Sequence, residues 1–275
     1  MTGALPDRRS FLIGATAAVA AACSGGGDDE SSATPASTTT APPETTTSTP
    51  ASTTTAPAES STADDPADAG LEPLTVAAFT ALPICAVPPS STAGPFPTIE
   101  QLDRRDVTED YPGHPLRLGI RVVDAGCNPV PGAEVEIWHT DATGDYSSYA
   151  DGGSGKDEGE GTTFCRGFQR ANADGILEFQ TIYPGWYEGR AVHIHVRARI
   201  NGGEVLTTQL YFDEAYTEAV YVEAPYAEFG SPDTTWASDF IAADPASDGS
   251  GITLAAAETS KGSGTLGLIN LGLPV

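Results

Sequence analysis

The stretch that decides the fold of this chain reads Tyr183-Pro184-Gly185-Trp186-Tyr187-Glu188-Gly189-Arg190-Ala191-Val192-His193-Ile194-His195-Val196. Side chains of a β-strand alternate between its two faces, so His193 and His195 share one face. The alternate positions are apolar and predict a face that packs on a core: Val192, Ile194, Val196 and Ala198. Tyr187 and Arg190 stand just before the histidines, and core packing alone does not require such a concentration of polar chemistry.

Short alternating segments with turn signals surround this stretch. Residues 205–212 follow an Asn-Gly-Gly turn and are the expected hairpin partner of the histidine strand. One or two helical turns are expected over 213–222. Further strands are expected over 116–124, 133–140, 164–171, 176–182 and near 265–273. The pattern predicts an all-β fold, a β-sandwich of mostly antiparallel strands with long functional loops and little helix.

Composition narrows the class of partner. The chain has 275 residues and a formal net charge of −25. Nucleic-acid binding requires a basic surface that neutralises phosphate, so this excess of acid excludes nucleic acid as a partner. It also argues against electrostatic attachment to anionic lipid. Large apolar residues are scarce between the N-terminal leader and residue 70, which leaves roughly 205 residues for one folded domain.

The N-terminus has the features of an export signal. The run Arg8-Arg9-Ser10-Phe11-Leu12 resembles a twin-arginine signal, and the apolar run behind it is too short to span a bilayer. Ala20-Ala21-Ala22-Cys23 resembles a lipobox, in which the cysteine becomes the lipidated first residue of the mature protein. The expected location is the extracellular face of the cell membrane through a lipid anchor at Cys23. Secretion after simple cleavage is the alternative.

Three segments follow from these features. Residues 1–23 are the expected signal peptide with its lipobox, and residues 71–275 are the expected β-sandwich domain. Between them, residues 24–70 are Thr, Ser, Pro and Ala with a few acids and lack apolar periodicity, so a disordered tether is expected. The remaining cysteines of an exported domain allow at most one internal disulfide, and the pair stays open among Cys85, Cys127 and Cys165.

Motifs recur in a fixed order along the domain: GPF at 94–96, AEVEIWH at 133–139, GDYS at 144–147, FCRGFQ at 164–169, TIYPGWY at 181–187, GRAVHIH at 189–195 and TQLYF at 208–212. This ordered set resembles the intradiol ring-cleavage dioxygenases, which are non-haem iron(III) enzymes related to protocatechuate and catechol dioxygenases. The resemblance covers about 85–240. It is closest to the exported, single-chain branch, because no helical dimerisation segment precedes residue 94.

The resemblance implies a ligand set for Fe(III), a non-haem iron: Tyr146, Tyr187, His193 and His195. It also implies that Tyr187 is released when substrate chelates, and that it then takes a proton from the catechol. Phenolate is a hard anionic donor that suits Fe(III), with imidazole completing a mixed N/O set. Arg190 would be the cation beside the substrate ring and Gln209 a polar group behind it. The alternative to this role is that Arg190 simply forms an ion pair with one of the many carboxylates. His139 is expected to be structural.

The implied reaction is cleavage of a catechol-type ring between its two hydroxylated carbons with O₂, giving a cis,cis-muconate-type diacid. The implied partners are this small molecule and O₂, while the particular catechol and the oligomeric state stay open. One competing hypothesis keeps the fold without the chemistry, as a prealbumin-like surface-binding lipoprotein. Another is a copper or zinc hydrolase, which lacks a third His or Glu at ligand spacing.

Overall fold

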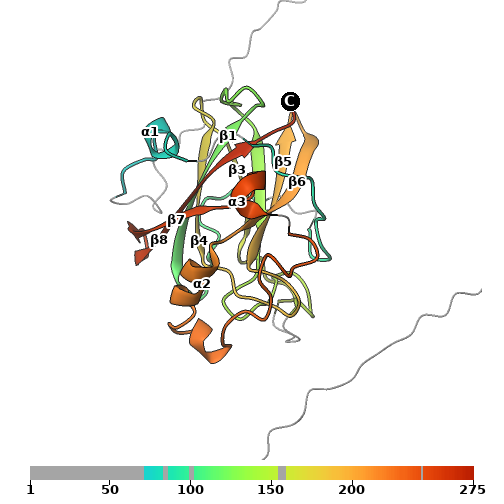
Figure 1. Cartoon of the computed structure of the whole chain (residues 1–275), viewed down its shortest axis with the longest axis vertical. Coiled ribbons are helices and arrows are strands. Elements are labelled where there is room, and N and C mark those ends of the chain that lie inside the picture. Colours follow the sequence, from blue (N-terminus) through green and yellow to red (C-terminus); the bar gives the residue numbers. More distant parts are fainter. Residues whose placement is uncertain (1–70, 83–85, 99–101, 154–158, 243) are drawn as a thin grey trace, which may run out of the picture. The chain divides into compact units, whose positions relative to one another are not determined.

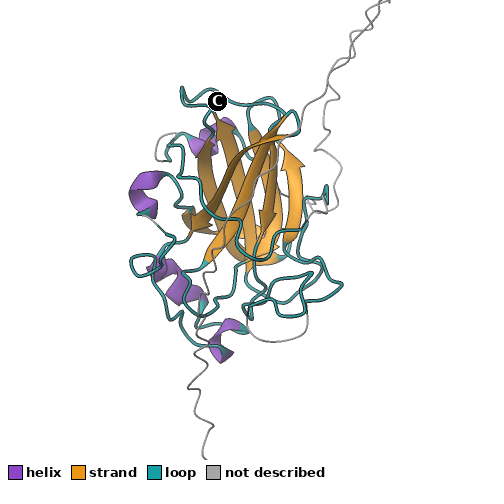
Figure 2. Cartoon of the chain, turned by 90° about the vertical axis from the view of Figure 1, so that its right-hand side faces the viewer, coloured by secondary structure: helices purple, strands orange, loops and turns teal. Residues whose placement is uncertain are grey.

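The computed structural model describes residues 71–82, 86–98, 102–153, 159–242 and 244–275. These residues form two four-stranded sheets, in the strand orders β4-β1-β8-β7 and β3-β2-β5-β6 (Figure 1). Figure 2 shows the strands gathered in the centre, with the helices and most loops outside them. The predicted all-β sandwich with little helix is confirmed.

The first sheet combines segments from both ends of the domain. It consists of β1 (Pro115–Val123), β4 (Ile176–Ile182), β7 (Thr253–Thr259) and β8 (Gly262–Gly272). β1 pairs antiparallel with β4, and β7 with β8, whereas β1 and β8 run parallel. The last strand therefore returns to the middle of the sheet.

The second sheet carries the histidine strand and is antiparallel throughout. It consists of β2 (Glu134–Trp138), β3 (Arg166–Arg170), β5 (His193–Ile200) and β6 (Gly203–Tyr211). The expected hairpin of β5 with β6 is present. Strands expected from alternation over 116–124, 133–140, 164–171 and 176–182 correspond to β1 to β4 within a few residues.

The core lies between the sheets, where the apolar face of β5 packs. Ile194, Val196 and Ala198 are fully buried, as the alternation predicts, and join Leu118 and Ile120 of β1 in one cluster. Burial of each Val, Leu or Ile side chain in this cluster contributes about 1.5–3 kcal/mol. This packing fixes the register of β5 and so fixes which way its histidines face.

The helices are short and peripheral. They are α1 (Val76–Phe79), α2 (Glu214–Val220), the 3₁₀ turn η2 (Tyr226–Glu228) and α3 (Pro245–Asp248). α2 is the helix expected over 213–222, and the side chain of Asp213 caps it by accepting from the backbone N–H of Tyr216. None of the helices of the described residues is long and apolar enough to cross a membrane.

Several expectations concern residues outside the described part. The signal peptide, the tether and Cys85 belong to this group. Of the other cysteines, Cys127 is disulfide-bonded, and Cys165 is a buried free thiol. One bonded cysteine and one free thiol agree with the expected limit of a single internal disulfide.

Candidate metal centre

The candidate site lies on the face of the second sheet that points away from the core. Directly paired residues of antiparallel strands share a face, and His195 of β5 pairs with Trp138 of β2 and Gln209 of β6. His193 pairs in the same way with Tyr211. Loops close this face to water, since His193 is 3% and His195 1% exposed.

Two loops bring phenol oxygens to these imidazoles. Tyr146 comes from the loop that follows β2, and Tyr187 from the loop that precedes β5. Tyr146 Oη lies 3.2 Å from His193 Nε2, and Tyr187 Oη lies 3.4 Å from the same nitrogen. His195 Nε2 lies 3.2 Å from it. The structure thus brings together all four residues predicted as iron ligands.

The surroundings of His193 Nε2 fit a cation. The other ring nitrogen, Nδ1, donates to the carbonyl of Ala191 at 2.6 Å, which leaves the lone pair on Nε2. One lone pair accepts one hydrogen bond, yet three polar atoms crowd around it. Donors held about 2 Å from a common ion stand roughly 3 Å apart. The observed spacing is that of ligands around one ion.

Burial sets the charge of these groups. Desolvation lowers the pKa of His193 to about 3 and also lowers the pKa of His195. Both imidazoles are therefore neutral near pH 7, which is the form that binds metals. Desolvation raises the pKa of Tyr146, and it raises that of Tyr187 against the opposing charge of Arg190. Phenolates in this site therefore need a cation beside them.

The type of donor restricts the type of metal. The described residues contain no group of three or more His, Cys, Asp or Glu side chains that could hold a metal. A cation at this site must therefore take phenol oxygens as well as the two imidazoles. That mixed set suits a hard trivalent ion and disfavours the zinc or copper hydrolase.

Packing orients the ring of His195. The indole of Trp138 stacks on it with 4.9 Å between centroids and 2° between planes. Gly94, at a φ of +68°, approaches so closely that a Cβ there would stand 3.1 Å from ring atom Cε1. His195 Nδ1 has no hydrogen-bond partner among the described residues. The motif at 94–96 therefore has a structural reason, which is close approach to this imidazole.

Glycine permits the two tyrosine loops to touch. Gly144 has a φ of +91°, and a Cβ there would stand 2.2 Å from the carbonyl oxygen of Trp186. Asp141 closes the same turn, because its Oδ1 accepts from the backbone N–H of Asp145 at 3.1 Å. Tyr146 follows directly, so this turn determines where its phenol lies.

Two further side chains hold the Tyr146 loop, and sequence reasoning assigned neither a role. Arg166 of β3 donates from Nε to Ser147 Oγ at 2.7 Å and from Nη2 to the Ser147 carbonyl at 2.8 Å. Phe96 stacks on the Tyr146 ring with 4.7 Å between centroids. Both residues lie in the motifs at 164–169 and 94–96, so the motifs marked the positions without revealing the contacts.

Arg190 lies beside the donors with all parts of its guanidinium engaged. Nε donates to Asp239 Oδ2 at 2.9 Å, and Nη1 donates to Tyr187 Oη at 3.4 Å. Nη2 donates a short hydrogen bond to Gln209 Oε1, which also accepts from the Tyr211 hydroxyl at 3.0 Å. Arg190 therefore pairs with a carboxylate and also faces the candidate centre, while its role beside a substrate ring stays a prediction.

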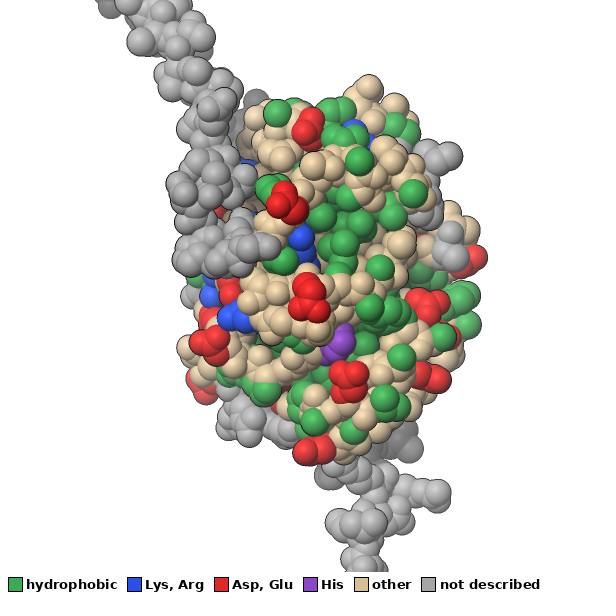
Figure 3. Space-filling model, turned by 90° about the vertical axis from the view of Figure 1, so that its left-hand side faces the viewer, with side chains coloured by type: hydrophobic (Ala, Val, Ile, Leu, Met, Phe, Trp, Pro, Cys, Tyr) green, Lys and Arg blue, Asp and Glu red, His purple; other side chains and the backbone are tan. Residues whose placement is uncertain are grey.

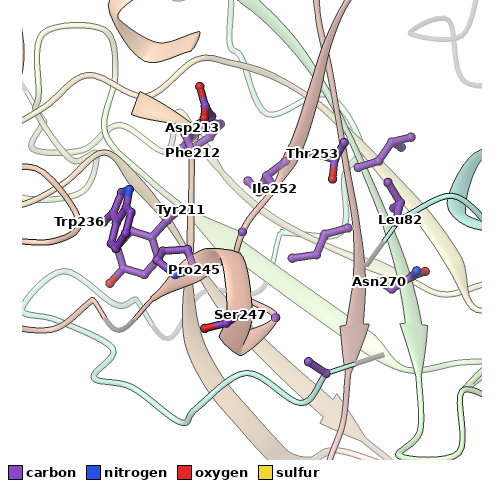
Figure 4. A pocket seen from close by; sticks show the side chains of 15 residues that line it. Leu82, Tyr211, Phe212, Asp213, Trp236, Pro245, Ser247, Ile252, Thr253 and Asn270 are labelled. Carbon is purple, nitrogen blue, oxygen red and sulfur yellow. The ribbon is translucent and has the colours of Figure 1, made fainter. Parts of the chain in front are cut away.

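A separate cavity of about 360 Å³ lies beside α3, β7 and β8. Figure 4 shows Trp236 and Tyr211 on one side of it, with Pro245 and Ser247 of α3 close by. None of the four candidate ligands lines this cavity. Tyr211 lines this cavity, and its hydroxyl bonds to Gln209 of the candidate site.

Comparison with known proteins agrees with the geometry. Residues 92–229 match the model of a family described as Dioxygenase. The chain belongs to the intradiol ring-cleavage dioxygenase family, which confirms the resemblance drawn from the motifs.

Individual relatives are similar over part of their length. Chlorocatechol 1,2-dioxygenase of Rhodococcus opacus is 29% identical over an alignment 123 positions long, which covers 38% of this chain and 46% of the relative. Catechol 1,2-dioxygenase of Acinetobacter baylyi is 31% identical over an alignment 165 positions long, which covers 50% of this chain and 50% of the relative. The chain spans about half the length of these curated relatives. An intradiol ring-cleavage dioxygenase from Tetranychus urticae has a TM-score of 0.62 at 29% identity, covering 69% of this chain and 95% of that one.

Proposed function

We propose that this protein is a non-haem iron(III) intradiol dioxygenase. It would cleave a catechol-type ring between its two hydroxylated carbons with O₂ and yield a cis,cis-muconate-type diacid that retains both oxygen atoms. The observation that carries the proposal is the convergence of two phenol oxygens and two imidazole nitrogens, with separations of 3.2–3.4 Å from His193 Nε2.

Four side chains would hold the iron: Tyr146, Tyr187, His193 and His195. When bound, iron(III) would supply a site at which a chelated catechol gives up its protons and becomes reactive toward O₂. The neutral histidines and the buried phenols suit such an ion, because two phenolates offset most of its charge in a site closed to water. Trp138 and Gly94 keep the His195 ring in place.

Tyr187 would accept a substrate proton. Among the proposed ligand atoms, Tyr187 Oη lies farthest from His193 Nε2, at 3.4 Å. Arg190 Nη1 donates a hydrogen bond of the same length to this oxygen. A cationic donor next to this oxygen supports the phenolate until a catechol hydroxyl delivers its proton there. Among the described residues no arginine donates a hydrogen bond to the Tyr146 hydroxyl, so the two phenols would have different roles.

Arg190 would stabilise negative charge that develops on the substrate. Arg190 is buried, and its Nη1 group points to the oxygen that the substrate would displace. Fixed donors in a site without water are worth far more than the same donors in solution. Gln209 holds the opposite arm of the guanidinium and thereby limits its rotation.

Two finer features belong to the same proposal. The two relatives described above bear the names chlorocatechol and catechol 1,2-dioxygenase, which supports an unsubstituted or halogenated catechol rather than an anionic one. An acidic chain repels anionic substrates, which points the same way.

We also propose that the protein acts outside the cytoplasm, exported by its twin-arginine-type signal and anchored through Cys23.

The test is a panel of catechols assayed with the iron-loaded protein for O₂ uptake and for product absorbance. We expect equal amounts of O₂ and catechol to be consumed and a colourless diacid to form. Consumption of no catechol by protein that holds a full complement of iron would refute the proposal. Binding of catechols without turnover would favour the surface-binding sandwich instead.

A further inference from the structure

We propose that Asp239 is a positioning residue that orients the Arg190 guanidinium toward the candidate centre, a role that rests on the proposed function. Asp239 lies beyond residues 92–229, the segment matched by the family model. It is also outside every motif that indicated the site from sequence. Its role is inferred from its contacts alone.

The Asp239 carboxylate is built into the protein as an acceptor for Arg190. Its side chain is 0% exposed, and that of Arg190 is 7% exposed. Oδ2 accepts from Arg190 Nε at 2.9 Å and from the backbone N–H of Ala191 at 2.8 Å. One oxygen therefore holds both the side chain of Arg190 and the backbone that leads to His193.

The second oxygen of Asp239 is held just as firmly. Oδ1 accepts from the backbone N–H groups of Ile241 at 2.7 Å and Ala242 at 3.2 Å. Four N–H groups thus donate to the Asp239 carboxylate, which can only accept hydrogen bonds when ionised. These contacts lower the pKa of Asp239 in spite of its burial. An amide in its place would turn an NH₂ group toward at least one of these donors.

The pairing determines where the remaining arms of Arg190 point. A guanidinium is planar and rigid, so fixing two of its nitrogens fixes the direction of the third. Asp239 holds Nε and Gln209 holds Nη2, which leaves Nη1 directed at Tyr187 Oη. Without the Asp239 carboxylate, only the hydrogen bond to Gln209 would hold the guanidinium, and the guanidinium could rotate away from Tyr187 Oη.

The same pairing keeps the charge of Arg190 in a buried place. A buried cation without a partner is expensive, and removing one member of a buried pair leaves the other uncompensated. The adjacent Phe240 covers one side of the guanidinium, with its ring centroid 5.6 Å from Cζ, although Phe240 itself is 81% exposed. Residues 239–240 therefore form the outer wall of the arginine site.

A plainer explanation is that Asp239 only anchors the segment 239–242. A double-mutant cycle separates the two roles, because residues acting through one another give non-additive effects. The variants are Asp239→Asn, Arg190→Gln and the double variant, each loaded with iron and assayed with the best catechol of the panel. Glu178→Gln is the matched control, since Glu178 is a partly buried carboxylate that pairs with Arg105 and Arg117 on the other sheet.

If Asp239 acts through Arg190, Asp239→Asn lowers kcat/KM about tenfold, mainly in kcat, and Arg190→Gln lowers it about a hundredfold. The double variant then matches Arg190→Gln alone, and Glu178→Gln keeps the activity of the parent protein. The proposal is overturned if Asp239→Asn leaves kcat/KM unchanged. The proposal is also overturned if the loss of kcat/KM in the double variant equals the product of the two single losses.

Two further measurements keep the proposal testable if a variant unfolds or if no catechol is cleaved. Asp239→Glu keeps the charge and displaces it by one methylene, so we expect an intermediate loss of kcat. The Nε–H resonance of Arg190 in metal-free, ¹⁵N-labelled protein is independent of activity. It should exchange slowly with solvent in the parent protein and become fast or vanish in Asp239→Asn; persistence of slow exchange would refute the positioning role.

Discussion

At the scale of single residues, the centre is organised around His193 Nε2. The hydrogen bond from Nδ1 to the Ala191 carbonyl leaves the lone pair on Nε2. Two phenol oxygens and the Nε2 atom of His195 lie around that lone pair. A protein without a cation at this point would hold two phenols and two imidazoles with too few hydrogen-bond partners. The iron roles of these residues stay predictions, and they are open to direct tests.

Tyr146→Phe removes one oxygen donor and leaves the aromatic packing intact. We expect the purified variant to hold less than about a tenth of the iron of the parent protein, because loss of one ligand weakens metal binding at least tenfold. Metal analysis after Fe(III) loading measures this. Tyr149→Phe is the control, since Tyr149 lies on the same loop and its hydroxyl bonds to the Pro97 carbonyl instead. Equal iron in both variants would show that Tyr146 is not a ligand.

The sequence could name some of these residues and not others, for a physical reason. Tyr187, His193 and His195 lie on one short stretch, where alternation predicts the shared histidine face. Asp239 reaches Arg190 from 49 residues away. It is one among 38 acidic residues, and no local pattern distinguishes it. Only the folded chain shows which carboxylate meets the arginine.

At the scale of elements, β-strand register places the two histidines of the site, and loops place the two tyrosines. Trp138, the last residue of β2, pairs with His195, so the loop after β2 leaves the sheet beside the histidines. Alternation predicted β5 and β6 because their apolar faces are buried. β7 was not predicted, because it is an Ala-rich edge strand that is largely exposed and carries little alternation.

Gly144→Ala should disrupt the contact between the two tyrosine loops. A methyl group there would clash with the Trp186 carbonyl in addition to the strain of a positive φ. Left-handed strain alone costs about 1–2 kcal/mol, so we expect a larger loss of unfolding free energy together with loss of iron. Gly161→Ala is the control, with a φ of +76° and nothing within 4 Å of the added Cβ. Similar losses in both variants would contradict the clash. Chemical denaturation and metal analysis measure the two effects.

His139, just after β2, should make the domain sensitive to acid. It is fully buried, donates from Nδ1 to the Thr140 carbonyl and accepts from the Thr181 hydroxyl. Desolvation lowers its pKa from 6.5 to about 4. Between these values the unfolded chain takes up a proton and the folded one does not, so stability falls as pH falls.

The contribution of His139 is at most about 1.4 kcal/mol per pH unit in that window. We expect His139→Gln to flatten the pH dependence of the unfolding free energy between pH 6.5 and 4 by a measurable part of this slope. Denaturant unfolding of metal-free protein at several pH values measures it. Parallel curves for parent and variant would mean that His139 does not carry the effect.

At the scale of the whole molecule, net charge restricts the class of partner, and the location of the protein stays a proposal. On the face in Figure 3, acidic side chains stand singly among apolar and uncharged ones, and basic side chains are few. A net charge of −25 repels nucleic acid and anionic small molecules, so we expect neutral small molecules as substrates. The sequence alone supports this conclusion, because it depends on composition and not on fold.

Cys23→Ser tests the proposed anchor. If Cys23 carries lipid, the parent protein should sediment with membranes and partition into detergent, whereas the variant should be released. Fractionation of cells followed by immunoblotting measures this. Cys165→Ser is the control, because Cys165 is a free thiol buried within the domain. Membrane retention of Cys23→Ser would contradict lipidation at this residue.

The visible spectrum of the protein loaded with Fe(III) tests the central claim most directly. Two tyrosinates on iron(III) predict a red-brown protein with a broad charge-transfer band, and that band should shift when catechol is added. The parent protein should show both, and Tyr146→Phe should lose most of the colour. A parent protein that stays colourless after Fe(III) loading, or whose band ignores catechol, would contradict the account.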